Sequence, residues 1–138
     1  IEVYDPEMVG QSGYDYKLLA SFNKTGISYI AKNTNANTIT HYVSEKSRKI
    51  DECLKLMREM LPNAQIQTAK VAIISVIGSN MRIPGFLSRA AGALAQAGIN
   101  ILALDQCMRQ VNIQFIIERT RFKNAQIALH REFVEEKP

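Results

Sequence analysis

The sequence predicts an α+β protein built from two consecutive βαββαβ units, each with an antiparallel sheet. The first supporting observation is an internal repeat, in which residues 23–28 (NKTGIS) match residues 95–100 (AQAGIN), 72 positions later. The second is the order of patterns within each repeat: loop, amphipathic helix, Gly-Ile, strand, polar turn, strand, helix. The third is chain length, because 138 residues suffice for two small units of about 70 residues each.

Apolar spacing and turn residues define the elements of the first half. A helical stripe at residues 14, 18, 19 and 22 is followed by Gly26, a typical stop signal. Ser44 is a suitable N-cap for a second amphipathic helix, which Pro62 ends. The expected elements are a strand at 1–4, a loop at 5–13, a helix at 14–24, strands at 27–31 and 38–43 around an asparagine-rich turn at 32–37, a helix from 44 to 61, and a β-type stretch at 64–77.

The second half repeats this order, which is the ferredoxin-like plan. Its expected elements are a strand at 71–77, a loop at 78–82, a helix from Pro84 to about residue 97, strands at 99–104 and 111–118, and a helix at 124–133. We therefore place a boundary near Lys70, with units at 1–70 and 71–138, and expect the two sheets to pack together. An obvious last strand is missing, so we expect it to be very short, truncated or supplied elsewhere.

Composition and charge narrow the possible functions. The net charge of +4 is dispersed, and acidic residues alternate with basic ones, which is typical of solvated helix faces rather than of a nucleic-acid surface. The strand at 111–118 offers a single aromatic residue, Phe115, whereas RNA-binding sheets of this plan expose two or three. No apolar run approaches the roughly 20 residues that span a bilayer. We expect no nucleic acid or membrane partner.

The first residues and the two cysteines indicate what kind of protein the chain comes from and in which redox environment it folds. It begins Ile-Glu-Val without an initiator methionine, so we expect a piece of a longer protein. Cys53 and Cys107 are far apart, and we expect two buried free thiols in a reducing, cytoplasmic environment.

The motifs of common catalytic and metal sites are missing. The sequence contains no phosphate-binding Gly-Lys-Ser/Thr loop, no HExxH, no GxGxxG and no evident nucleophile–base–acid set. His41 and His130 are isolated from other ligand-type residues, and we expect His41 to be a core or interface histidine rather than a pH sensor. We expect no catalytic residue, no metal and no cofactor in this chain.

Two glycine-containing loops are the most informative segments. Residues 8–15 and 78–86 each place glycine at the start of a helix. Glycine lets a ligand approach the backbone closely, and a helix N-terminus offers unpaired N–H groups to a carboxylate. The alternative is that these glycines only shape tight turns between strand and helix.

The residues of these loops resemble a known family. Asp5-Pro6-x-Met8-Val9-Gly10 with Gly13-Tyr14, and Val76-Ile77-Gly78-x-x-Met81-x-x-Pro84-Gly85-Phe86 with residues 97–101 (AGINI), are similar to the tandem ACT domains of bacterial aspartate kinases. The resemblance covers nearly the whole chain, and residues 32–42 resemble a subgroup associated with ectoine production. It implies a parent enzyme that phosphorylates the side-chain carboxylate of L-aspartate with MgATP. The kinase segment Lys-Phe-Gly-Gly-Thr-Ser is absent, so this chain should not itself catalyse a reaction.

The resemblance also implies an allosteric amino-acid effector of the lysine or threonine class, bound between ACT units and often across a dimer. By matching position, the effector-binding residues are Met8, Gln11, Gly13, Tyr14, Asp15, Ser28, Tyr29, Ile30, Asn35, Asn37 and Thr38, with Asn80, Met81, Gly85, Asn100 and Ile101 on the partner surface. Lysine-sensitive relatives commonly have acidic residues where Ile30 stands and near Ala36 and Asn37. Asp15 could substitute if it points inward. The alternative function is a structural dimerisation module without an effector.

Overall fold

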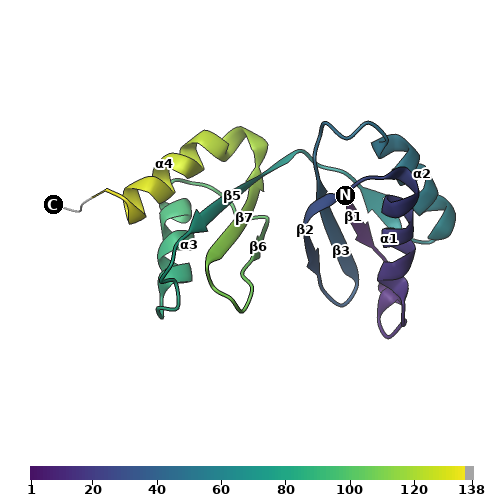
Figure 1. Ribbon diagram of the computed structural model, residues 1–138, viewed down its shortest axis with the longest axis horizontal. Coiled ribbons are helices and arrows are strands. Elements are labelled where there is room, and N and C mark those ends of the chain that lie inside the picture. Colours follow the sequence, from purple (N-terminus) through teal and green to yellow (C-terminus); the bar gives the residue numbers. More distant parts are fainter. Residues whose placement is uncertain (136–138) are drawn as a thin grey trace. The chain divides into compact units, whose positions relative to one another are not determined.

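The computed structural model describes residues 1–135 and divides the chain into two compact units, Ile1–Ala69 and a second unit that starts at Lys70 (Figure 1). The boundary lies one residue before the predicted position, in the short connection between two strands. Each unit has its own sheet and its own apolar core. Within the described residues, none of the helices is long and apolar enough to cross a membrane.

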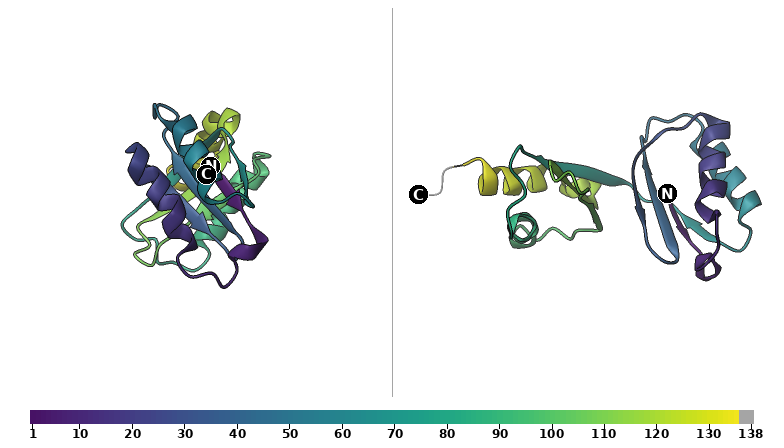
Figure 2. Two further views of the ribbon diagram at one scale, coloured as in Figure 1. Left: turned by 90° about the vertical axis from the view of Figure 1, so that its right-hand side faces the viewer. Right: turned by 60° about the horizontal axis from the view of Figure 1, so that its bottom comes forward.

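The first unit is a four-stranded antiparallel sheet covered on one face by two helices. Its strands are β1 (Glu2–Tyr4), β2 (Tyr29–Thr34), β3 (Thr38–Val43) and β4 (Gln65–Gln67), in the order β2-β3-β1-β4. The helices are α1 (Tyr14–Thr25) and α2 (Ile50–Met60), which lie side by side on one face of the sheet (Figures 1 and 2). A short 3-10 helix, η1 (Pro6–Met8), follows β1. This is the predicted ferredoxin-like unit.

The second unit repeats this plan with three strands. Its elements are β5 (Val71–Ile77), α3 (Phe86–Gln96), β6 (Ala103–Asp105), β7 (Asn112–Glu118), η2 (Arg119–Arg121) and α4 (Phe122–Phe133). The antiparallel sheet has the order β5-β7-β6, and α3 packs beside α4. β5 takes the position that β1 has in the first unit. Among the described residues no strand follows α4, so the edge of β5 that corresponds to the β4 side of β1 has no partner strand.

The repeated Gly-Ile ends the first helix of each unit in the same way. Gly26 and Gly98 have φ values of 68° and 66°, a left-handed conformation that costs a side chain free energy. The next N–H, of Ile27 or Ile99, donates to the carbonyl of Phe22 or Leu94 over 3.0 Å in both units. The isoleucine then enters the core. The sequence repeat is therefore a repeated helix cap.

The ends of several elements differ from the prediction. The second helix starts at Ile50 and not at Ser44, because Ser44 accepts from the N–H of Lys46 and of Ser47 and so forms a separate turn. The strand predicted at 99–104 has the ladder positions Ala103–Asp105 only. The division of the β-type stretch at 64–77 into β4 and β5, by contrast, agrees with the predicted boundary near Lys70, and β5 has the bounds predicted for the strand at 71–77.

Other bounds move by two or three residues. The strand predicted at 27–31 is β2, Tyr29–Thr34, and the helix predicted from Pro84 starts at Phe86 after Gly85. The last helix starts at Phe122, two residues before the predicted 124. Cys53 is buried as expected, but Cys107 is exposed, because it lies in the turn between β6 and β7.

Candidate functional site

A buried carboxylate organises the loop between β1 and α1. Asp5 is 6% exposed, and its Oδ1 accepts from the N–H of Glu7 at 2.9 Å, which caps η1. Its Oδ2 accepts from the Tyr14 hydroxyl at 2.7 Å. Burial, together with this hydrogen bond, raises the pKa of the Tyr14 phenol. The two ends of the loop are thereby tied together across Asp5.

The middle of this loop is open to solvent. Gln11 and Gly13 are exposed, whereas the side chains of Met8 and Tyr14 are buried in the core of the first unit. Gly13 precedes α1 with φ 74°, and no side chain caps the first turn of the helix. Of the predicted contact residues in this loop, Gln11 and Gly13 are therefore accessible from solvent, while Met8 and Tyr14 support the loop from beneath.

The asparagine-rich turn lies next to this loop. The N–H of Asp5 donates to the carbonyl of Asn37 over 2.9 Å. The side chain of Asn35 accepts from the N–H of Thr38 at 2.9 Å and of Asn37 at 3.2 Å, so it is engaged within its own turn. The structure thus places Asn37 beside Asp5, at the start of the loop.

The predicted residues at the start of β2 lie at the opposite end of this strand from the asparagine-rich turn. Ser28, Tyr29 and Ile30 are exposed, Ile30 with 63% of its surface. They line a shallow groove of about 500 Å³ with Arg48 and Lys49. At about 3.3 Å per strand residue, Tyr29 is roughly 20 Å along β2 from Asn35. One small ligand does not contact both ends of this strand.

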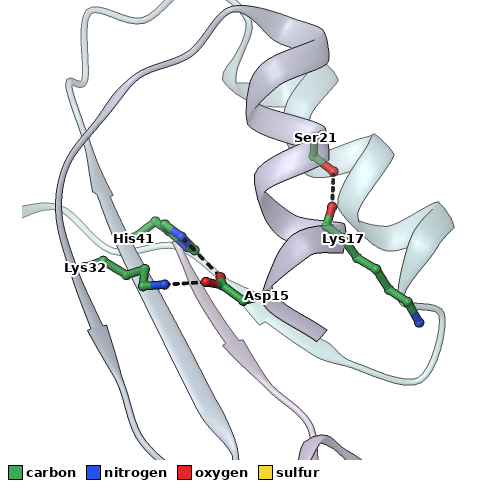
Figure 3. A network of polar contacts seen from close by, with 5 residues as sticks. All are labelled: Asp15, Lys17, Ser21, Lys32 and His41. Atoms are coloured by element: carbon green, nitrogen blue, oxygen red, sulfur yellow. Dashed lines mark hydrogen bonds and ion pairs between the residues drawn. The ribbon is translucent and has the colours of Figure 1, made fainter. Parts of the chain in front are cut away.

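Asp15 is the charged centre of the site (Figure 3). It lies in the first turn of α1, and its Oδ2 forms an ion pair with the Lys32 ammonium on β2. Its Oδ1 is buried, lacks a hydrogen-bond partner and lies 3.8 Å from Nε2 of His41 on β3. Lys32 and His41 are register partners, which places them on the same sheet face beneath α1. Asp15 is among the residues predicted from the sequence, whereas Lys32 is not, because it was predicted to lie in a turn and lies instead on β2.

His41 is a core histidine, as expected. It is fully buried, and neither ring nitrogen has a hydrogen-bond partner. The rings of Phe22 and Tyr29 lie 4.8 Å and 5.2 Å from the imidazole, centroid to centroid. Burial lowers the pKa of His41 to about 4. The nearby Asp15 carboxylate raises this pKa in part, and the Lys32 ammonium lowers it again. The imidazole is therefore neutral at pH 7.

Of the effector-binding residues predicted in the second unit, some side chains are buried and others are exposed. Met81 is 3% exposed and packs against Gly78, where an added Cβ would lie 3.2 Å from the Met81 Cγ. Ile101 packs against the core. Asn80 and Asn100 are exposed, and Gly85 precedes α3 with φ 85°. Within residues 1–135, no group of three His, Cys, Asp or Glu side chains could hold a metal ion.

The chain has two ferredoxin-like units in tandem, each with a glycine-containing loop before its first helix and a Gly-Ile cap after it, which is the arrangement that the resemblance to tandem ACT domains implies. Residues 74–133 match the family described as ACT domain. Over 98% of its length the chain is 36% identical to aspartate kinase Ask_Ect of Stutzerimonas stutzeri, and it spans 28% of that relative.

Solved structures give the same fold. The regulatory subunit of aspartate kinase from Thermus flavus superposes with a TM-score of 0.82 at 19% identity, covering 96% of this chain and 90% of that one. Escherichia coli aspartokinase III, solved with lysine and aspartate, gives a TM-score of 0.75 at 13% identity, covering 97% of this chain and 30% of that one. The resemblance to the regulatory ACT domains of aspartate kinases is thereby confirmed.

Proposed function

We propose that this chain is the regulatory region of an aspartate kinase and that it binds a free amino acid at the loop before α1. The parent enzyme would transfer the terminal phosphoryl group of ATP, with Mg²⁺, to L-aspartate to give 4-phospho-L-aspartate. This chain would contribute no catalytic group. Its free thiols suit a cytoplasmic enzyme of amino-acid biosynthesis.

The observation that carries the proposal is the open start of α1. The exposed segment from Gln11 to Gly13 leads into a twelve-residue helix without a side-chain cap. Unpaired N–H groups and the helix dipole at such a terminus favour an α-carboxylate. The adjoining turn offers the side-chain NH2 groups of Asn35 and Asn37 to the rest of an amino acid, since their side-chain oxygens accept hydrogen bonds within the turn. An effector bound here would act on the kinase by its different affinity for two states of the protein.

Calorimetric titration of the 138-residue chain tests this proposal. L-Lysine, L-threonine and the other amino acids of the aspartate family are titrated singly and in mixtures. We expect heat with at least one of them, weaker in Gln11→Ala and unchanged in Gln96→Ala, which truncates an exposed glutamine at the end of α3. Absence of heat with every amino acid would contradict the sensor function.

The second candidate is a dimerisation module without an effector. Ile30, where lysine-sensitive relatives commonly carry an acid, presents an exposed apolar side chain. Sedimentation analysis separates the two functions. A dimer that neither binds amino acids nor changes its mass when they are added would favour the structural role.

A further inference from the structure

The only carboxylate among the predicted contact residues is Asp15. It follows the exposed Gly13 by two positions, in the first turn of α1. A ligand with a cationic side chain, such as lysine or ornithine, needs a carboxylate at its ammonium group, because a poorly paired buried charge costs several kcal/mol. Asp15 is therefore the residue that decides whether this site accepts a cationic amino acid.

Neither oxygen of Asp15 is available to a ligand. Oδ1 is buried against the imidazole of His41, 3.8 Å from its Nε2, so an incoming ligand cannot reach it. Oδ2 is paired with the ammonium of Lys32. Lys32 projects from β2 on the sheet face beneath α1, directly across the ladder from His41 (Figure 3). Its ammonium thus occupies the position in which a ligand ammonium would have to pair.

We propose that Lys32 is a specificity-determining residue, a built-in cation that excludes cationic amino acids from the site and leaves it to neutral ones. The competition is unequal, because Lys32 is held in the same chain and so has a high effective concentration at Asp15, whereas a free amino acid must be supplied in solution. This inference rests on the proposed function, because it requires that the amino acid binds at the loop before α1.

The variant Lys32→Met tests the inference, because it keeps the aliphatic stem of the side chain and removes its charge. We expect L-lysine and L-ornithine to bind this variant at least about tenfold more tightly than they bind the unaltered chain, which is the gain of one hydrogen-bonded charge. The double variant Lys32→Met/Asp15→Asn should lose this gain. Lys24→Met, an exposed lysine in the last turn of α1, is the matched control and should leave the affinity unchanged.

The preference between ligands is the informative measurement, since general loosening of the fold would not favour cationic over neutral amino acids. Far-ultraviolet circular dichroism checks folding, and Lys32→Gln replaces Lys32→Met if the latter is unfolded. If a neutral amino acid binds the unaltered chain but lysine gains nothing in either Lys32 variant, the inference is wrong and the proposed function stands. If no amino acid binds any variant, both are wrong.

Discussion

Acidification should destabilise the first unit through His41. The side chain is fully buried between Phe22 and Tyr29, and its pKa is lowered from 6.5 to about 4. Well above pH 6.5 the imidazole is neutral in both the folded and the unfolded chain and does not affect the pH dependence of the free energy of unfolding. As the pH falls from 6.5 towards 4, the unfolded chain takes up a proton that the folded chain does not. The folded state therefore loses stability in this range.

The magnitude follows from the difference in pKa. Each pKa unit corresponds to 1.36 kcal/mol, so a pKa lowered from 6.5 to about 4 removes roughly 3 kcal/mol from the free energy of unfolding at pH 4. That is a large share of the stability of a small domain. The matched variant is His41→Phe, which introduces the side chain that the second unit carries at the equivalent, fully buried position, Phe115.

Tyrosine fluorescence during urea unfolding isolates the first unit. The chain has no tryptophan, and all five tyrosines lie in that unit, at positions 4, 14, 16, 29 and 42. Carboxylates also titrate between pH 7 and 4, but they are common to both proteins, so the difference between them reports His41. We expect the unaltered chain to lose roughly 3 kcal/mol more than His41→Phe over this range. Equal losses in both proteins would refute the argument from burial.

Three further predictions concern local features. Tyr14→Phe leaves the buried Asp5 carboxylate without one donor and should lower the free energy of unfolding of the first unit by about 1–3 kcal/mol, measured by urea unfolding against Tyr16→Phe, an exposed tyrosine. Gly26→Ala should cost about 1 kcal/mol because of its positive φ, and a change below 0.3 kcal/mol in the same measurement would contradict the cap geometry. With a thiol reagent at pH 8, Cys107 should react rapidly and Cys53 only on unfolding, because Cys53 is buried and burial raises the pKa of its thiol; two equal fast phases would show otherwise.

Local patterns predicted the repeating parts of this fold well. The strand Thr38–Val43 was predicted with its observed bounds, since alternating side chains and a preceding asparagine turn define it. The predicted start of α2 at Ser44 was wrong, because a serine can cap either a helix or a turn, and tertiary contacts decide between the two. The burial of Met8 and Met81 depends on how their loops close over the core, which spacing alone does not show.

The charged centre of the site could not be predicted as a set. Asp15, Lys32 and His41 come from three different elements, and Lys32 was assigned to the turn because asparagines follow it. Its pairing with Asp15 depends on β2 extending to Thr34 and on the register with β3. The sequence contains only a partial signal for this pairing. Lys32 lies close to an extended segment, and His41 lies on the apolar face of the strand that follows.

The two units have sheets of unequal completeness, and this bears on their behaviour in solution. β1 is paired on both sides, while β5 presents a row of backbone N–H and C=O groups along one edge, within residues 1–135. Ile77, near one end of that edge, is 78% exposed. Such an edge is a template for adding another strand. On concentration, self-association of this chain by strand addition should therefore be possible along β5, whose counterpart in the first unit, β1, is covered by β4 on the corresponding side.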